Sequence, residues 1–454
     1  MVMVNEQRSG TAEKGVPPGF KKTEVGIIPE GWECKYLGEL GDIVRGGSPR
    51  PAGDPKYFEG DFIPWLTVAS LTTIPDAQLV VMTTSSMLTE LGSKHSRTLE
   101  KGTLIISNSG ATLGVAKLLG IKCCANDGVA AIINQRIGDK SFLVHYINTI
   151  TKNLHDKIAT GNGQPNLNTD LIRLIPIPFP NEKEQEKIAD TLSNCDNFIL
   201  ELEKLIAKKQ AIKTATMQQL LTGKTRLPQF ALHNDGSVKG YKKSELGEIP
   251  EDWHTLTILD MVKNIIDYRG RTPKKLGMDW GNGDIVALSA GNVKKGYIDF
   301  SSECYFGSEE LYNRWMTSGT PKKDDIVFTM EAPLGNAALI TDEKKYILSQ
   351  RTILLQINEE EFNPTFILQI LLSDFFQKYI SDCATGSTAQ GIKRSVFEKL
   401  YIATPKNKQE QTAIAAILSD MDKDIQTLQQ RLDKTRQLKQ GMMQELLTGK
   451  TRLI

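Results

Sequence analysis

A long stretch that occurs twice constrains this chain more than any other feature of its 454 residues. Residues 184–227 and 410–453 align without a gap at a shift of about 226 residues, and about half of the aligned positions are identical. Both copies begin with Glu-Gln and end with Leu-Leu-Thr-Gly-Lys-Thr-Arg-Leu. Any fold assigned to the chain therefore has to give these two stretches equivalent places.

Both copies carry the pattern of a long α-helix. Apolar residues recur at spacings of three and four, charged residues and Gln fill the other positions, and neither copy contains proline. Gly223 and Gly449 follow the last apolar residues and are candidate C-caps. The narrow apolar seam is typical of a coiled coil. The matching spacing favours pairing of the two copies with each other over packing of each helix on its own domain.

A second, shorter repeat indicates that the chain consists of two halves. Residues 19–32 read GFKKTEVGIIPEGW, and residues 240–253 read GYKKSELGEIPEDW. Each is followed by a block of about 150 residues that mixes short β-type runs with Gly, Asn and Ser, and then by a long helix. The two blocks share a plan but few residues, which suggests two related tasks on two different targets.

These repeats predict an α+β fold with a pseudo-twofold internal repeat. Residues 1–18 are polar and without period, so we expect a disordered N-terminal extension. A first globular mixed α/β domain follows over 19–183, a central helix over 184–227 and a linker over 228–240. A second domain of the same class follows over 241–409, and a C-terminal helix over 410–454.

Composition restricts the class of protein. The net charge is +1, so any surface that binds nucleic acid must be local. The six cysteines lack the spacing of metal ligands, which favours free thiols over zinc or disulfides. No apolar run reaches membrane length, and the N-terminus lacks the apolar core of a signal peptide. We therefore expect a cytoplasmic protein that binds no membrane.

The sequence lacks the common catalytic and cofactor-binding motifs. The Gly-Lys-Thr of each helix end is not a phosphate loop, because Gln218 and Gln444 stand where the earlier glycine is required. No GxGxxG follows a predicted strand, and GxSxG, HExxH and the Asn-Pro-Pro-aromatic signature of amino methyltransferases do not occur. We interpret the chain as a binding protein.

The candidate binding sites are Gly/Pro-containing segments that carry hydrogen-bond donors. Arg reads guanine edges and Asn or Gln reads adenine edges, whereas Lys and Ser more often hold phosphates. A solvated turn is the alternative for any single loop, and recurrence at matching points of both halves favours a binding role. The candidate DNA contacts of the first half are Arg45, Ser48, Arg50, Asn108, Ser109, Gln164 and Asn166. Those of the second half are Tyr268, Arg269, Arg271, Lys274, Lys275, Asn292, Lys294, Lys295, Lys393 and Arg394.

The order of these motifs resembles the DNA-specificity subunit of Type I restriction–modification enzymes. The resemblance rests on the IPEGW and IPEDW motifs, the two variable blocks, the helices that begin with Glu-Gln and the two LLTGKTRL endings, and it covers residues 19–454. It implies two target-recognition domains separated by two long antiparallel coiled-coil helices. Each domain is expected to bind one half of a bipartite target in double-stranded DNA, with the helices setting the spacing between the half-sites.

The resemblance also implies partners that perform the chemistry. The helices are expected to dock two methyltransferase subunits, which assemble with nuclease and translocase subunits. S-adenosylmethionine, ATP and magnesium are expected in those partners, so this chain is expected to hold no cofactor, no metal and no catalytic residue.

Two other classes of protein compete with this interpretation. A duplicated coiled-coil adaptor would bind protein partners rather than DNA, and salt-sensitive, sequence-dependent DNA binding separates it from a specificity subunit. A nuclease or methyltransferase in its own right is disfavoured by the missing motifs.

Overall fold

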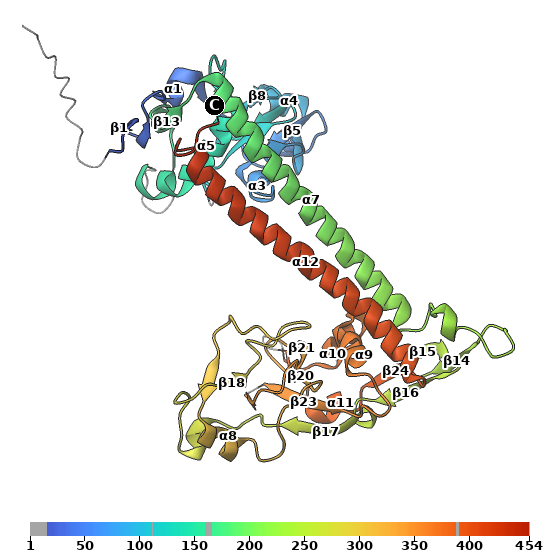
Figure 1. Cartoon of the computed structure of the whole chain (residues 1–454). Helices are drawn as coiled ribbons and strands as arrows, with labels where there is room; N and C mark the ends of the chain where they lie inside the picture. The colour runs from blue at the N-terminus through green and yellow to red at the C-terminus, as the bar shows by residue number, and fades with distance from the viewer. Residues whose placement is uncertain (1–15, 111, 159–165, 350, 387–389, 454) are drawn as a thin grey trace, which may run out of the picture. The chain divides into compact units, whose positions relative to one another are not determined.

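The computed structural model describes residues 16–453, apart from 111, 159–165, 350 and 387–389. It divides into two units (Figure 1). Unit 1 contains the chain up to Leu205 and again from Leu428, and unit 2 contains Ile206–Thr427. Most of the extension predicted over 1–18 therefore lies outside the described residues.

The two repeated stretches form long helices over most of the predicted length, but residues 221–227 and 447–453 lie beyond the helix ends. Helix α7 spans Glu182–Leu220 and helix α12 spans Lys408–Leu446, 39 residues each. Gly223 and Gly449 both adopt a φ of 71°, a left-handed conformation that ends a helix and disfavours a side chain. Each glycine lies three residues beyond the last residue of its helix, so it shapes the turn that follows the helix rather than the predicted C-cap position itself.

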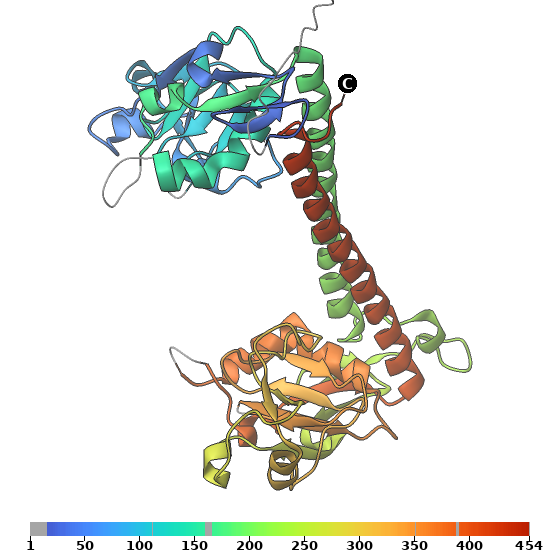
Figure 2. The same cartoon turned by 60° about the vertical axis from the view of Figure 1, so that its left-hand side comes forward.

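The helices pair in opposite directions inside each unit. In Figures 1 and 2 the last turns of α12 (red) lie beside the first turns of α7 (green) in unit 1. The side-chain pairs that fix this direction in unit 1 are Cys195–Met442, Asp196–Lys439 and Glu203–Arg436. The corresponding pairs in unit 2 are Lys209–Asp424 and Lys213–Asp422. The predicted pairing of the two copies is confirmed within each unit.

Two sheets form the core of the first domain. Their strand orders are β4-β12-β9-β10-β6 and β7-β5-β11-β8. The strands are β4 Asp42–Arg45, β5 Ile63–Leu66, β6 Val80–Val81, β7 Ser86–Leu88, β8 Arg97–Leu99, β9 Leu104–Ser107, β10 Ala116–Leu119, β11 Cys123–Ala125 and β12 Val129–Ile133. The central strands β9 and β12 are almost continuously apolar because both of their faces are covered.

Short helices cover these sheets. Helix α5 packs on β10, and the Asp139 side chain caps its start by accepting the N–H of Phe142. The helices of the first domain are α1 Leu37–Leu40, α2 Pro55–Phe58, α3 Val68–Thr72, α4 Glu90–Lys94, α5 Lys140–Asn153 and α6 Thr169–Arg173.

The second domain follows the same plan with different residues. Its sheets have the orders β17-β23-β20-β21 and β19-β18-β22. The strands are β17 Val262–Asp267, β18 Ile285–Leu288, β19 Tyr305–Gly307, β20 Ile326–Thr329, β21 Ala337–Leu339, β22 Tyr346–Leu348 and β23 Thr352–Ile357. The helices are α8 Glu309–Trp315, α9 Pro364–Leu372, α10 Asp374–Cys383 and α11 Arg394–Phe397.

Each domain opens and closes on small two-stranded sheets. A hairpin carries the IPEGW or IPEDW motif, and a further pair of strands joins the beginning of the variable block to its end. In unit 1 these strands are β1 Phe20–Thr23, β2 Gly26–Pro29, β3 Glu33–Tyr36 and β13 Pro176–Phe179. In unit 2 they are β14 Tyr241–Ser244, β15 Gly247–Pro250, β16 Trp253–Thr257 and β24 Tyr401–Pro405.

The repeated motifs meet where the long helices join the domains. In unit 1 the buried Trp32 donates its indole N–H to Glu184 (3.0 Å), and Glu184 also accepts from Arg452 at 2.5 and 2.7 Å. In unit 2, Arg226 pairs with Glu410 at 2.7 Å, and its guanidinium lies 5.8 Å from the centre of the Trp253 ring. The repeated motifs therefore build a similar junction of Trp, Glu and Arg in each unit.

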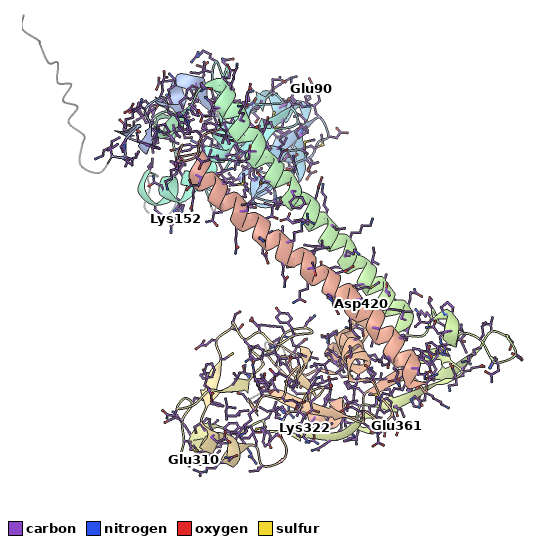
Figure 3. All side chains as sticks on the ribbon, in the orientation of Figure 1. Glu90, Lys152, Glu310, Lys322, Glu361 and Asp420 are labelled. Atoms are coloured by element: carbon purple, nitrogen blue, oxygen red, sulfur yellow. The ribbon has the colours of Figure 1, made fainter. Side chains whose placement is uncertain are left out.

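The glutamine of each Glu-Gln pair fixes the domain on its helix. Gln185 accepts the N–H of Asp139 at 2.8 Å, and Gln411 accepts the N–H of Asn363 at 2.8 Å. Gln411 also donates to the carbonyl oxygen of Glu361, which Figure 3 labels beside the start of α12. Because Asp139 and Asn363 cap α5 and α9, the same bond anchors the equivalent helix in each unit.

A carboxylate of each long helix joins the partner helix to the domain; Asp196 is buried, whereas the Asp422 side chain is 46% exposed. Asp196 accepts from Lys439 at 2.5 Å, and its second oxygen lies 3.9 Å from Nδ1 of the buried His145 on α5. In unit 2, Asp422 accepts from Lys213 at 2.5 Å and from Gln369 on α9 at 3.0 Å. The two junctions differ in that a titratable residue, His145, stands where unit 2 has Gln369.

We expect His145→Gln to make the protein less sensitive to acid. Burial, together with the charge of Lys439, lowers the pKa of His145 to about 3, from about 6.5 in an unfolded chain. The unfolded chain therefore takes up this proton first, and the free energy of unfolding falls as the pH drops from about 6.5 towards 3, by at most about 1.4 kcal/mol per pH unit. Glutamine cannot take up this proton, so that part of the loss should disappear.

Denaturant unfolding at pH 7 and pH 5 measures this effect. Asp196, whose pKa burial raises, is present in both proteins and largely cancels in the difference. The matched control is His155→Gln, because His155 is exposed just beyond the end of α5. If wild type and His145→Gln lose equal stability between the two pH values, the buried histidine is not an acid-sensitive group.

Candidate nucleic-acid interface

Three loops converge at one end of the main sheet of the first domain. Strand β12 runs antiparallel to both β4 and β9, so its start lies beside their ends. Arg45 ends β4, Asn108 follows β9, and Asp127 precedes β12. A bridge between Ser109 and Asn166 brings the segment with Asn166, the third predicted segment of this half, to the same place. The approach is close, because a Cβ at Gly46 would collide with the backbone of the loop before β12.

Asp127 is the centre of these loops. Its carbonyl oxygen accepts from Nε of Arg45 at 2.6 Å and from Nδ2 of Asn108 at 3.2 Å. Its carboxylate accepts from Ser48 Oγ at 2.7 Å and lies 3.5 Å from Arg50 and 4.0 Å from Arg45. We call these five residues the Asp127 group. The hydrogen bond from Ser48, aided by the two arginine charges, lowers the pKa of Asp127.

The predicted residues of the first half differ in their access to a ligand. The side chains of Arg45 and Arg50 are 51% and 71% exposed, whereas Asn108 is buried. Asn108 therefore holds the loops together, and we do not propose it as a direct DNA contact. Gln164 lies outside the described residues. Sequence reasoning missed Asp127, because a lone aspartate before a glycine reads only as a turn.

The equivalent loops of the second domain also meet at one end of their sheet. Asp267 ends β17 and pairs with Arg269 at 2.6 Å, and Glu331 follows β20 and pairs with Arg351 at 3.4 Å. A bridge between Glu331 and Gly391 brings the segment with Lys393 and Arg394 to this end. We call Asp267, Arg269, Glu331, Arg351 and Arg394 the Asp267 group. Sequence reasoning missed Arg351 and the two carboxylates.

Two predicted contacts of the second half lie in the core. Tyr268 is 2% exposed, and its hydroxyl donates to the carbonyl oxygen of Gly319 at 2.9 Å. Asn292 is fully buried and accepts the N–H of Ser289 at 2.7 Å. Neither side chain reaches the surface, so we do not keep them as direct contacts. Aromatic and amide side chains can hold a loop as well as read DNA, and only burial separates the two roles.

The remaining cations of the second half lie on exposed loops. Arg271 stacks over the Tyr268 ring at 4.9 Å and donates to the carbonyl oxygen of Trp315 at 2.6 Å. Lys274 and Lys275 are exposed on the short 3-10 helix Pro273–Leu276. The structure places the predicted pair Lys294 and Lys295 on another loop, where Lys295 lines a cavity of about 480 Å³ with residues of α7 and α10.

Two alanine variants separate base reading from phosphate binding on the loop that carries Arg271 and Lys274. We expect Arg271→Ala to cost about 1–3 kcal/mol of binding and to relax the choice of base at one position. Lys274→Ala should weaken binding to all sequences alike and reduce the slope of log K against log salt by about 0.9. Lys243→Ala, on the exposed strand β14, is the matched control. Titration of labelled duplexes at several salt concentrations measures both effects, and unchanged binding in both variants would remove the loop from the interface.

The family of this chain follows from its two halves. The sequence model of the Type I restriction modification DNA specificity domain matches residues 29–214 and again residues 250–436. The chain belongs to this family. The two matches cover both variable blocks and most of both long helices, so each half of this specificity subunit is one copy of the family domain.

Curated relatives align with the specificity subunit over nearly its whole length. The MjaVIII specificity subunit of Methanocaldococcus jannaschii is 25% identical over 440 residues, 96% of each chain. The putative MjaX specificity subunit of the same organism is 25% identical over 461 residues, 96% of this chain and 97% of the relative. A 159-residue segment, 34% of this chain, is 26% identical to the HindI specificity subunit of Haemophilus influenzae, of which it covers 33%.

Solved structures share the fold. The S subunit of a Type I restriction–modification system from M. genitalium superposes with a TM-score of 0.56 at 14% identity, covering 91% of this chain and 96% of the other. A chain from a study of the complex assembly of the Type I system superposes with a TM-score of 0.54 at 14% identity, covering 93% and 99%. Mixed domains joined to long helices are therefore the architecture of this family.

Family membership decides between the competing classes of protein. The specificity subunit recognises a DNA target within a Type I restriction–modification complex and is a non-catalytic component of it. This favours DNA recognition over an adaptor that binds protein partners alone. Within the described ranges, we find no cluster of three or more His, Cys, Asp or Glu side chains that could hold a metal ion. None of the described helices is long and apolar enough to cross a membrane.

Proposed function

We propose that each domain of this specificity subunit reads one half of a bipartite target in double-stranded DNA. The first domain would use the Asp127 group and the second the Asp267 group. The observation that supports this most is the convergence of matching loops at the same end of equivalent sheets. In both groups, arginine side chains reach the surface beside a carboxylate. Arginine forks held in this way suit the acceptor edge of guanine.

We further propose that the long helices dock two methyltransferase subunits, which assemble with nuclease and translocase subunits. The helices keep apolar side chains at their surface, among them Leu205, Ile212 and Leu438, which are 40%, 44% and 60% exposed. Apolar residues on a charged helix suit a partner helix. S-adenosylmethionine, magnesium and ATP would then belong to the partner subunits, which methylate adenine and cleave DNA in the cytoplasm.

The test is to map what the full chain binds and what its complex methylates. The purified chain selects duplexes from a randomised library, and DNA from cells that carry the complex is sequenced for methylated adenine. We expect the same two half-sites, separated by a fixed gap, from both experiments, and binding that weakens steeply with salt. The chain without partners should neither cut nor methylate DNA. Selection of no sequence by a folded chain, or turnover by the chain alone, would contradict the proposal.

A further inference from the structure

We infer that Asp127 determines specificity in the first domain by holding Arg45 and Arg50 for base edges while keeping phosphates away. The inference rests on the proposed function, because it names the residue that makes the first domain selective. Asp127 is a positioning residue in this role, since it acts through the two arginines.

The contacts of Arg45 leave its two terminal guanidinium nitrogens free to donate. Its Nε–H is used on the carbonyl oxygen of Asp127 at 2.6 Å, and its terminal nitrogen lies 4.0 Å from the Asp127 carboxylate, beyond hydrogen-bond distance. A guanidinium held at Nε keeps its terminal N–H groups for two acceptors on one base, as O6 and N7 of guanine provide. The carbonyl oxygen of Asp127 therefore aims Arg45 without consuming the donors that read a base.

The carboxylate orders the neighbouring loop. It accepts from Ser48 at 2.7 Å and lies 3.5 Å from Arg50, so it fixes two residues of the segment that follows β4. The side chain of Arg50 is the more exposed of the two arginines and has the greater freedom to lose on binding DNA. A nearby carboxylate restricts that freedom before DNA arrives, which favours a single binding geometry.

The same carboxylate opposes unspecific binding. The Asp127 side chain is 40% exposed, and Ser48 and the arginines keep it ionised. A surface built only to attract phosphates gains nothing from an exposed negative charge in its centre. A carboxylate there repels phosphates but tolerates base edges that donate hydrogen bonds, such as N4 of cytosine. Specificity is a difference of affinities, and this repulsion lowers the affinity for the wrong sequences.

Asn108 holds the backbone at Asp127. Its side-chain N–H group donates to the carbonyl oxygen of Asp127 at 3.2 Å. Because Asn108 is buried, this bond fixes the backbone at Asp127.

The experiment compares wild type with Asp127→Asn as full-length chains. Asparagine keeps the size of the side chain and can still accept from Ser48, so the charge is the main change. The control is Asp42→Asn at the opposite end of β4, because Asp42 also pairs with an arginine, Arg136, at 3.6 Å. The probes are a randomised duplex library for selection and one fixed duplex of unselected sequence for affinity at several salt concentrations.

We expect Asp127→Asn to bind the unselected duplex about three- to tenfold more tightly at low salt, with a slope of log K against log salt steeper by about 0.9. The sequence that it selects should lose information in one half-site and keep the other half-site. Asp42→Asn should change neither property. A purely structural role would instead weaken binding to both kinds of DNA.

The other outcomes distinguish failure of the inference about Asp127 from failure of the proposed function. If Asp127→Asn selects the same split sequence with unchanged affinity for the unselected duplex, or weakens both equally, the inference about Asp127 is wrong. If wild type selects no sequence, the proposed function fails instead. Should Asp127→Asn not fold, Ser48→Ala loosens the same carboxylate with a smaller change, and unchanged selectivity in Ser48→Ala then rejects the inference.

Discussion

Exchange of residues 33–180 for the same block of another specificity subunit will change one half of the methylated sequence and leave the other half intact. The block lies entirely in unit 1. Its two ends pair with each other, since β3 is antiparallel to β13 with Glu33 opposite Phe179 and Tyr36 opposite Pro176. Both boundaries of the exchanged block therefore lie at one small two-stranded sheet, and the exchange transfers a complete folded block. The junction of Trp32, Glu184 and Arg452 remains native.

The second domain offers the reciprocal exchange. Residues 254–405 are closed in the same way by β16 and β24, with His254 opposite Thr404. Methylated adenines in DNA from cells that carry each hybrid complex give the result. The first hybrid should alter one half-site and the second hybrid the other. A folded hybrid that alters both half-sites, or neither, would show that the domains do not read DNA independently.

Insertion of four residues into the long helices will lengthen the gap between the half-sites without changing either half-site. Four residues add about 6 Å and about one turn, so the apolar seam continues on nearly the same face. A base pair advances about 3.4 Å, so the mapped gap should grow by one to two base pairs. Helix α7 is continuous from Glu182 to Leu220 and carries residues of both units, which makes it a suitable spacer.

The structure shows where to insert. The border of the units falls between Leu205 and Ile206 in α7 and between Thr427 and Leu428 in α12. A second copy of residues 202–205 in α7 and of residues 428–431 in α12 leaves the ion pairs within each unit in place. Insertion at 213–216 is less suitable, because Lys213 pairs with Asp422.

A loop insertion is the matched control for the spacer. Four residues added after Gly236, in the turn of the linker, lengthen the chain equally but lengthen no helix. Methylation mapping should give an unchanged gap for this variant. An unchanged gap in the folded and active helix variant would show that the helices do not set the spacing.

Local patterns in the sequence determined the long helices and the family. The spacing of apolar residues and the two glycines that follow the helices involve neighbours within a few positions, so they can be read without coordinates. Two of the short β-type runs of the first block, residues 61–66 and 103–107, contain β5 and β9 for the same reason. The duplicated motifs identified the family because their order, and not any single motif, is specific.

Only the tertiary structure decided what the motifs do and which loop residues are accessible. The bond between Glu184 and Arg452 joins residues 268 positions apart, and no local pattern reveals such a contact. Tyr268 is predicted as a DNA contact, but its ring is buried among residues distant in sequence. No local pattern marks Asp127, yet the antiparallel pairing of β12 with β4 and β9 places it between two arginines. The burial of a side chain and the convergence of loops depend on contacts between segments distant in sequence. Local sequence patterns do not predict such contacts.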